Sequence, residues 1–183
     1  YYVECKNVIK KLVTMTFDTN GGNTVDPITR KETTILPTIP TPVKRGYEFD
    51  GWCTDAGCEN MFTSKTVPTE DITLYAKWKP AIYTLTFNVN GGNELDKNTK
   101  RVTYDEKYGE IPQLVRDGYA FLGWYTKVEG GEQITADDQV LITSNTTLYA
   151  HWRKLKPIPA ETFVFNPHTY FYDSAIERAT EYT

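Results

Sequence analysis

The chain has 183 residues, a formal net charge of −4 and an aromatic content of 14%. The negative charge disfavours nucleic acid as a partner, because nucleic acid requires a basic surface. No apolar run approaches the ~20 residues that a membrane-spanning helix needs. The chain opens on Tyr1 without a signal peptide, so we expect any export signal or anchor to lie elsewhere.

A motif of the form Gly-Tyr-x-Phe-x-Gly-Trp occurs twice, and both copies have the same neighbours in the same order. The copies lie at 46–52 and 118–124, with Thr-Phe-x-x-Asn-Gly-Gly upstream at 16–22 and 86–92, and Thr-Leu-Tyr-Ala-x-Trp downstream at 73–78 and 147–152. The offset between the copies drifts from 70 (86 − 16) to 74 (152 − 78), as insertions in loops would produce. Self-similarity of this kind predicts two tandem modules.

The predicted organisation has five segments. An N-terminal flank with a possible strand (1–12) precedes the first module (13–78), a short linker (79–82) leads to the second module (83–152), and a C-terminal flank (153–183) follows. Because the linker is short and contains Pro80, we expect the modules to stand in a restricted orientation.

Each module is predicted to begin with a half-buried antiparallel strand. Residues 13–18 and 83–89 alternate apolar and polar side chains with period two. Each strand ends at Asn-Gly-Gly, which favours a hairpin turn with positive φ. A calcium loop is disfavoured, because Thr29 stands where a bidentate acid is needed. Polar return strands are expected at 24–34 and 94–104.

A proline-bearing crossing then leads to the repeated motif, and 106–115 in the second copy is compatible with a short helix. Strict alternation would place the tryptophan of the motif on the other face of the strand from its Tyr and Phe. The preceding Gly51 or Gly123 predicts a β-bulge that returns the indole to their side. For Trp52 and Trp124 we expect core packing rather than an aromatic sugar-binding platform. The predicted structural core is Tyr47, Phe49, Trp52, Trp78, Tyr119, Phe121, Trp124 and Trp152.

The closing strands place Tyr75 and Tyr149 outward at matching positions, which makes them the candidate binding surface. In the C-terminal flank, 161–166 is compatible with a strand and 175–181 with a short helix. Both flanks are compatible with strand addition to a sheet, in the same chain or in a neighbouring one. Self-association through these flanking strands is therefore one hypothesis.

The three ordered motifs resemble the internalin B repeat family, also called the Listeria–Bacteroides repeat, over residues 13–152. The resemblance implies a β-grasp-like module, used in tandem in secreted and surface proteins as a spacer or adhesive element, without catalytic residues. The resulting fold expectation is mainly β with little helix (α+β, β-grasp-like). The departures, Arg45 against Asp117 and Cys53 against Tyr125, lie beside the core motif and leave the fold expectation unchanged.

Cys53 and Cys58 are separated by a loop that can close tightly, so a local disulfide is predicted for a secreted protein. Cys5 is then left over, either as a buried small hydrophobe or as an intermolecular link. No metal or cofactor is predicted, because zinc would need more ligands than His151 and His168 can add. Asn145 begins a glycosylation sequon.

Neither histidine has a signalled catalytic partner, so we expect no enzyme activity. The favoured function is a non-catalytic spacer or adhesive region of an extracellular, secreted or cell-surface protein, with a protein or glycan partner. Two alternatives stay open: a glycan-binding module that uses exposed aromatics, and a subunit of an extracellular filament joined by strand addition.

Overall fold

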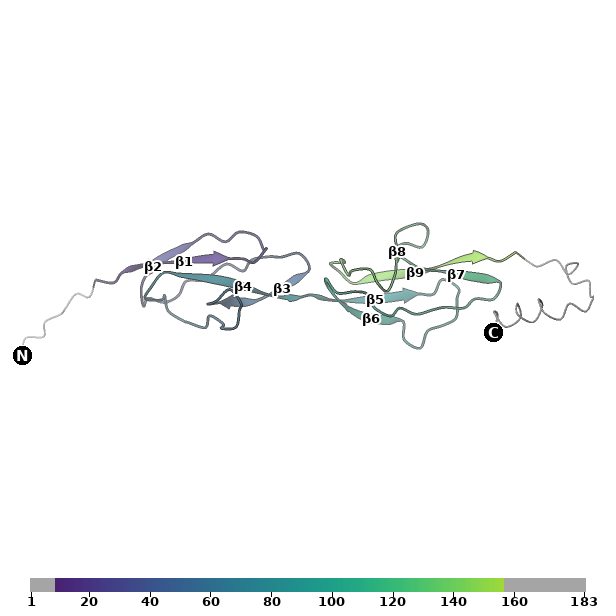
Figure 1. Cartoon of the computed structure of the whole chain (residues 1–183), viewed down its shortest axis with the longest axis horizontal. Helices are drawn as coiled ribbons and strands as arrows, with labels where there is room; N and C mark the ends of the chain where they lie inside the picture. Colours follow the sequence, from purple (N-terminus) through teal and green to yellow (C-terminus); the bar gives the residue numbers. More distant parts are fainter. Residues whose placement is uncertain (1–8, 157–183) are drawn as a thin grey trace, which may run out of the picture.

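The computed structural model describes residues 9–156, which form two similar β-sheet modules placed end to end (Figure 1). The first module contains β1 (Leu12–Asp18), β2 (Ile28–Lys31), β3 (Tyr47–Cys53) and β4 (Ile72–Pro80). The second contains β5 (Ile82–Asn88), β6 (Thr99–Thr103), β7 (Tyr119–Tyr125), β8 (Gln133–Ile134) and β9 (Thr146–Lys154). The prediction of a mainly β fold with two tandem modules is confirmed.

The strand orders of the two sheets, β2-β1-β4-β3 and β6-β5-β9-β7-β8, match over four strands, and β8 is an additional edge strand of the second sheet. In both sheets the two central strands, β1 with β4 and β5 with β9, are parallel, and the outer pairs are antiparallel. The prediction of an antiparallel first strand is therefore right for one neighbour and wrong for the other. Period-two alternation reports a half-buried strand but not the direction of its partners.

The Asn-Gly-Gly motif ties the end of the first strand to the centre of the sheet. Asn20 has a φ of 47° and its Nδ2 donates to the carbonyl of Ala76 at 2.9 Å, and Asn90 repeats this with Ala150 at 3.0 Å. A Cβ at Gly22 would lie 2.7 Å from the ring of Trp78, so only glycine lets this tryptophan approach. The indole of Trp78 then donates to the carbonyl of Thr19 at 2.9 Å. The motif is therefore a structural clamp.

The repeated Gly-Trp step forms a β-bulge in both modules. The register between β3 and β4 shifts between Phe49 and Gly51, and Gly51 has a φ of 119°. The bulge turns Trp52 inward, where its ring lies 5.3 Å from Phe49 and 4.9 Å from Phe17. The indole therefore lies on the Phe side of the sheet, as the sequence analysis expects.

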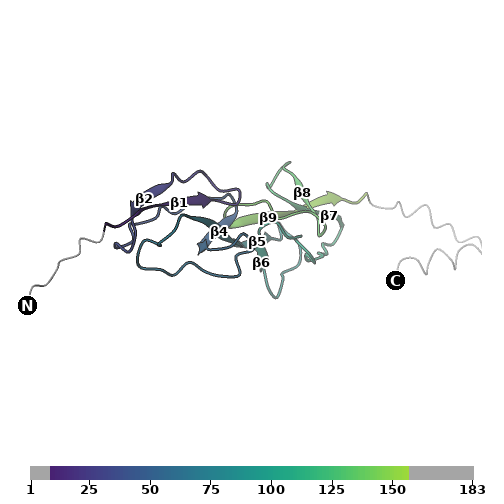
Figure 2. The same ribbon diagram turned by 60° about the vertical axis from the view of Figure 1, so that its left-hand side comes forward.

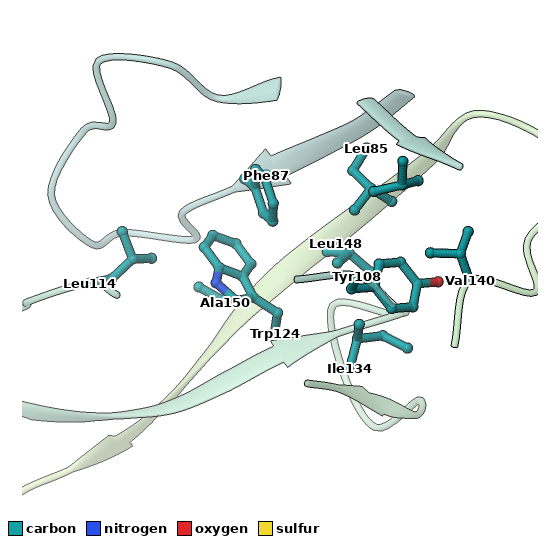
Figure 3. Packing of buried hydrophobic residues seen from close by; sticks show 10 residues of the cluster. Leu85, Phe87, Tyr108, Leu114, Trp124, Ile134, Val140, Leu148 and Ala150 are labelled. Carbon is teal, nitrogen blue, oxygen red and sulfur yellow. The ribbon is translucent and has the colours of Figure 1, made fainter. Parts of the chain in front are cut away.

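The core of the second module is built around Trp124, which is 1% exposed (Figure 3). Its ring packs 4.8 Å from Phe87, and its Nε1 donates to the carbonyl of Pro112 at 2.7 Å. Because the buried Nε1–H has an acceptor, burial of the indole does not incur the free-energy cost of an unpaired polar group. The other buried members of this core are Leu85, Val102, Tyr108, Leu114, Ile134, Val140, Leu148 and Ala150.

Not every predicted core residue is deeply buried. Trp78 and Trp152 are partly buried and pack against the cores from one side. Tyr47 and Tyr119 belong to none of the hydrophobic clusters of residues 9–156, so their assignment to the core is corrected. Both tyrosines begin their strands and lie at the end of their module, where the sheet no longer covers them.

The segment 106–115 contains no helix, and residues 9–156 as a whole contain none. Tyr108 is buried there and Gly109 has a φ of 65°, which a helix does not accommodate. The expected linker 79–82 is largely absorbed into strands, because β4 runs to Pro80 and β5 starts at Ile82. None of the described residues forms a helix with the length and apolarity needed to cross a membrane.

The flank predictions fall mostly beyond the described part. Of the flank 1–12, where a strand is possible, the structure describes only residues 9–12: residues 9–11 are irregular, and β1 begins at Leu12. The strand expected at 161–166, the helix expected at 175–181 and Cys5 lie outside residues 9–156.

Candidate functional site

The two modules meet at a joint formed by Gly46 and Tyr47 of the first and by Tyr104 and Asp105 of the second. The two sides lie on either side of the passage from β4 to β5, which Figure 1 shows as the connection between the modules; in the turned view of Figure 2 the ends of the two modules overlap at this place. The amide of Ala81 donates to the carbonyl of Gly46 at 2.9 Å, and the amide of Tyr104 donates to the carbonyl of Ala81 at 2.9 Å. One residue is thereby bonded to both modules.

Side chains complete the joint. The hydroxyl of Tyr47 donates to Oδ2 of Asp105 at 2.8 Å, and its ring meets Tyr104 edge-on with centroids 5.5 Å apart. Lys44 places its Nζ 4.4 Å from the centre of the Tyr47 ring. Gln139 donates from Nε2 to the other carboxylate oxygen of Asp105 at 2.7 Å, which orients the acceptor.

Gly46 allows this close approach. It is buried, has a φ of 76°, and a Cβ there would lie 2.3 Å from the ring of Tyr104. Any larger residue would both strain the backbone and collide with the ring. The glycine of the repeated motif is thus a contact residue of the joint in the first module.

The hydrogen bond at the joint also perturbs the titration of Tyr47. The acceptor Asp105 favours the neutral phenol, and partial burial adds to this, so the pKa of Tyr47 is raised above its ordinary value. The side-chain contact is therefore present only while the phenol keeps its proton.

The candidate binding residues Tyr75 and Tyr149 are half-buried rather than freely exposed. Tyr149 lies opposite Tyr125 on β7, and the Tyr125 ring stacks on His151 with centroids 3.9 Å apart and planes at 8°. Tyr125, Tyr149 and His151 therefore form an aromatic row on the outer face of the second module. The sequence analysis identified only Tyr149 of this row and considered His151 only as a zinc ligand or a catalytic residue.

The first module carries a different group at this place. Cys53 pairs with Tyr75 in the sheet and forms a disulfide with Cys58, with Cα atoms 5.1 Å apart. Asp55 closes the loop by accepting the amides of Glu59 and Asn60 at 3.0 and 2.9 Å. These two hydrogen bonds hold the pKa of Asp55 below its ordinary value.

The two modules therefore carry different side chains on their outer faces, although their strands pair in the same way. The exchange of Cys53 for Tyr125, and of Lys77 for His151, is visible in the aligned repeats and is the signal that could have located the aromatic row. Among residues 9–156, no group of three His, Cys, Asp or Glu side chains is arranged to hold a metal ion.

Two copies of one mixed-sheet module, bonded through a defined joint, make this a tandem β-repeat protein. The chain belongs to the Listeria-Bacteroides repeat domain family, whose model matches residues 14–77 and 83–151. The family resemblance found in the sequence motifs is confirmed.

Relatives contain a similar stretch of sequence within much longer proteins. Internalin H of Listeria monocytogenes is 36% identical over 143 residues, which is 77% of this chain and 25% of that protein. A protein of Evansella cellulosilytica is 32% identical over 146 residues, covering 76% of this chain and 21% of its own length. The chain therefore spans a quarter or less of these relatives.

A solved structure of Streptococcal High Identity Repeats in Tandem domains 3-4 from a cell surface protein was also found. It covers 77% of this chain and 96% of its own, with 18% identity and a TM-score of 0.23. That TM-score is too low to establish a common arrangement.

Proposed function

We propose that this chain is a non-catalytic spacer segment of an extracellular protein, and that the joint holds its two modules in line. The observation that carries the proposal is the hydrogen bond from Tyr47 to Asp105 across the joint, beside the double backbone contact at Ala81. A spacer must keep the parts that it joins at a fixed separation. A hydrogen-bonded joint, with only one linker residue outside the strands, leaves the two modules little freedom to bend relative to each other.

The extracellular assignment rests on chemistry and on the family. The Cys53–Cys58 disulfide is a bond that persists in oxidising compartments. Internalin H and this chain share the tandem repeat over most of this chain's length. Adhesion by the spacer itself, or assembly into a filament through the flanks, would be an additional role.

Residual dipolar couplings of the full chain test the spacer. With the wild type, one alignment tensor should fit the amides of both modules. Tyr47→Phe removes the hydroxyl that bonds Asp105, and the two modules should then require separate tensors. Tyr119→Phe makes the same change at the matching position of the second module and should leave one tensor. Two independent tensors in the wild type would refute an in-line spacer.

A second candidate is glycan binding by the aromatic row of the second module. The stack of Tyr125 on His151 beside Tyr149 offers flat apolar surface with polar edges, which sugar rings contact well. A glycan array should then show binding that Tyr149→Ala abolishes. Tyr75→Ala, at the matching position beside the disulfide, is the control and should keep it. Binding that is absent, or unaffected by Tyr149→Ala, excludes this candidate.

A further inference from the structure

The far end of the second module repeats one half of the joint. The amide of Leu155 donates to the carbonyl of Gly118 at 2.9 Å, as the amide of Ala81 does to Gly46. Gly118 has a φ of 73°, against 76° at Gly46. This surface is formed by Gly118, Tyr119, Arg116 and Leu155, and we refer to it as the terminal socket. It lies where β9 ends, away from the first module (Figure 1).

None of residues 9–156 covers the terminal socket, whereas its counterpart is filled. Gly46 is buried against the Tyr104 ring, but Gly118 is exposed, and a Cβ built there meets no atom of the described residues within 4 Å. Ala81 is 6% exposed, while Leu155 at the matching position is 49% exposed. A surface with the backbone geometry of an interface and with apolar area exposed is suited to a partner.

The joint itself shows which partner chemistry fits. It is filled by a tyrosine ring over the glycine, followed by a carboxylate that accepts the hydroxyl of the motif tyrosine. The terminal socket provides that hydroxyl on Tyr119. It also provides a cation, because the guanidinium carbon of Arg116 lies 3.9 Å from the centre of the Tyr119 ring. An aromatic residue followed by an acid is therefore the matching ligand.

Among the described residues, a second copy of the chain does not offer this pair at its front end. There the amide of Glu32 donates to the carbonyl of Lys11 at 2.8 Å, as Tyr104 does to Ala81, and Thr33 stands at the place of Asp105. The place of the Tyr104 ring is taken by Glu32, whose carboxylate accepts the amide of Lys11 at 3.0 Å, and the place of the acceptor Asp105 is taken by Thr33. In the whole sequence, tyrosine is followed by aspartate only at Tyr104-Asp105 and Tyr172-Asp173.

We propose that Tyr172-Asp173, in the C-terminal segment of this chain, docks into the terminal socket. The Tyr172 ring covers Gly118 and Leu155, and the Asp173 carboxylate accepts the hydroxyl of Tyr119 beside Arg116. The connection is long enough: Tyr172 lies 17 positions after Leu155 (172 − 155), against 23 positions from Ala81 to Tyr104 (104 − 81). The entropy of closing a loop depends weakly on its length, so the shorter tether carries no penalty. Attachment to the same chain also gives the pair a high effective concentration at the socket. This inference does not depend on the spacer function.

The test is NMR spectroscopy on the full 183-residue chain. Cross-relaxation between the Tyr172 ring protons and the Gly118 α-protons is expected, and its absence overturns the proposal. Tyr172→Ala should shift the Leu155 methyl and Gly118 amide signals and remove those cross-peaks. Asp173→Asn and Tyr119→Phe should weaken them.

Tyr170→Ala is the matched control, because it removes a tyrosine from the same segment that no aspartate follows, and it should leave the socket signals unchanged. The indole signal of Trp124 reports that the second module stays folded in every variant. Equal shifts from Tyr170→Ala and Tyr172→Ala would contradict specific docking. Cross-peaks that arise only between differently labelled copies would place the contact between molecules and would also overturn the proposal.

Discussion

The hydroxyl of Tyr47 lies 2.8 Å from Oδ2 of Asp105, so a residue of the repeated motif of one module is bonded to the next module. The contact uses only one of the two motif copies, since Tyr119 at the matching position lies at the end of the second module that faces away from the first, with the guanidinium carbon of Arg116 3.9 Å from its ring centre. The same motif therefore forms the joint in the first module and the terminal socket in the second.

Replacing Gly46 by alanine should open the joint. The new Cβ would lie 2.3 Å from the Tyr104 ring in a backbone of positive φ, so the modules must separate or the ring must move. The change should appear in residual dipolar couplings as a loss of a common alignment tensor. Gly118→Ala has the same sign of φ and meets no described atom within 4 Å, so it should cost about 1 kcal/mol of backbone strain and leave the module orientation unchanged. If both variants keep the wild-type orientation, Gly46 has no role in the joint.

Truncating Trp124 to alanine should unfold the second module selectively. The indole is 1% exposed and its Nε1 donates to Pro112, so the variant loses packing and leaves that carbonyl without its donor. The expected loss is about 3–5 kcal/mol, against a total stability on the order of 5–10 kcal/mol for a module of this size. Chemical denaturation followed by NMR should show signals of the second module melting first. Unchanged second-module signals would show that the core does not depend on this indole.

The strands, the bulge and the inward tryptophans could be predicted from the sequence, because they depend on local signals. Alternation of period two defines the buried face, and the glycine before Trp52 and Trp124 marks the place where the register shifts. Because these signals are repeated in two copies, the modules and the family are recognisable from the amino-acid sequence alone.

The joint could not be predicted, because its partners are not repeated. Tyr104 and Asp105 have Glu32 and Thr33 as counterparts, so the motif comparison passes over them. Tyr47 was assigned to the core, since an aromatic residue in a motif beside Phe49 and Trp52 normally packs there. Only the placement of the second module shows that its ring faces a neighbour. The aromatic row was missed for a similar reason: Tyr125 and His151 replace a cysteine and a lysine, and the stack forms only across two strands.

Reducing the Cys53–Cys58 disulfide should destabilise the first module alone. The bond closes a short loop that Asp55 also holds through two backbone amides. The expected loss is about 2 kcal/mol, the lower part of the usual range, because the loop is short. In thermal melts, a Cys53→Ser, Cys58→Ser variant should show a lower melting temperature for the first module and an unchanged one for the second. Equal shifts in both modules would indicate that their stabilities are coupled through the joint.

Raising the pH should loosen the joint before the modules unfold. Asp105 accepts a hydrogen bond from the neutral phenol of Tyr47, and the pKa of this phenol is raised above its ordinary value of 10.0. The contribution of the hydrogen bond is therefore complete below that ordinary value and is lost as the pH rises through the raised pKa, where a phenolate would face a carboxylate.

Burial also raises the pKa of Tyr108 in the core of the second module, so the Trp124 indole signal must be followed as the measure of folding. Across this range, the residual dipolar couplings of carbon-bound protons in the two modules should cease to fit one alignment tensor. The Trp124 indole signal should persist. Tyr47→Phe, which keeps Tyr108, should already have lost the common tensor at neutral pH and show no further change. A wild-type joint that stays rigid until Trp124 unfolds would mean that the Ala81 backbone contacts hold the modules without the Tyr47 hydroxyl.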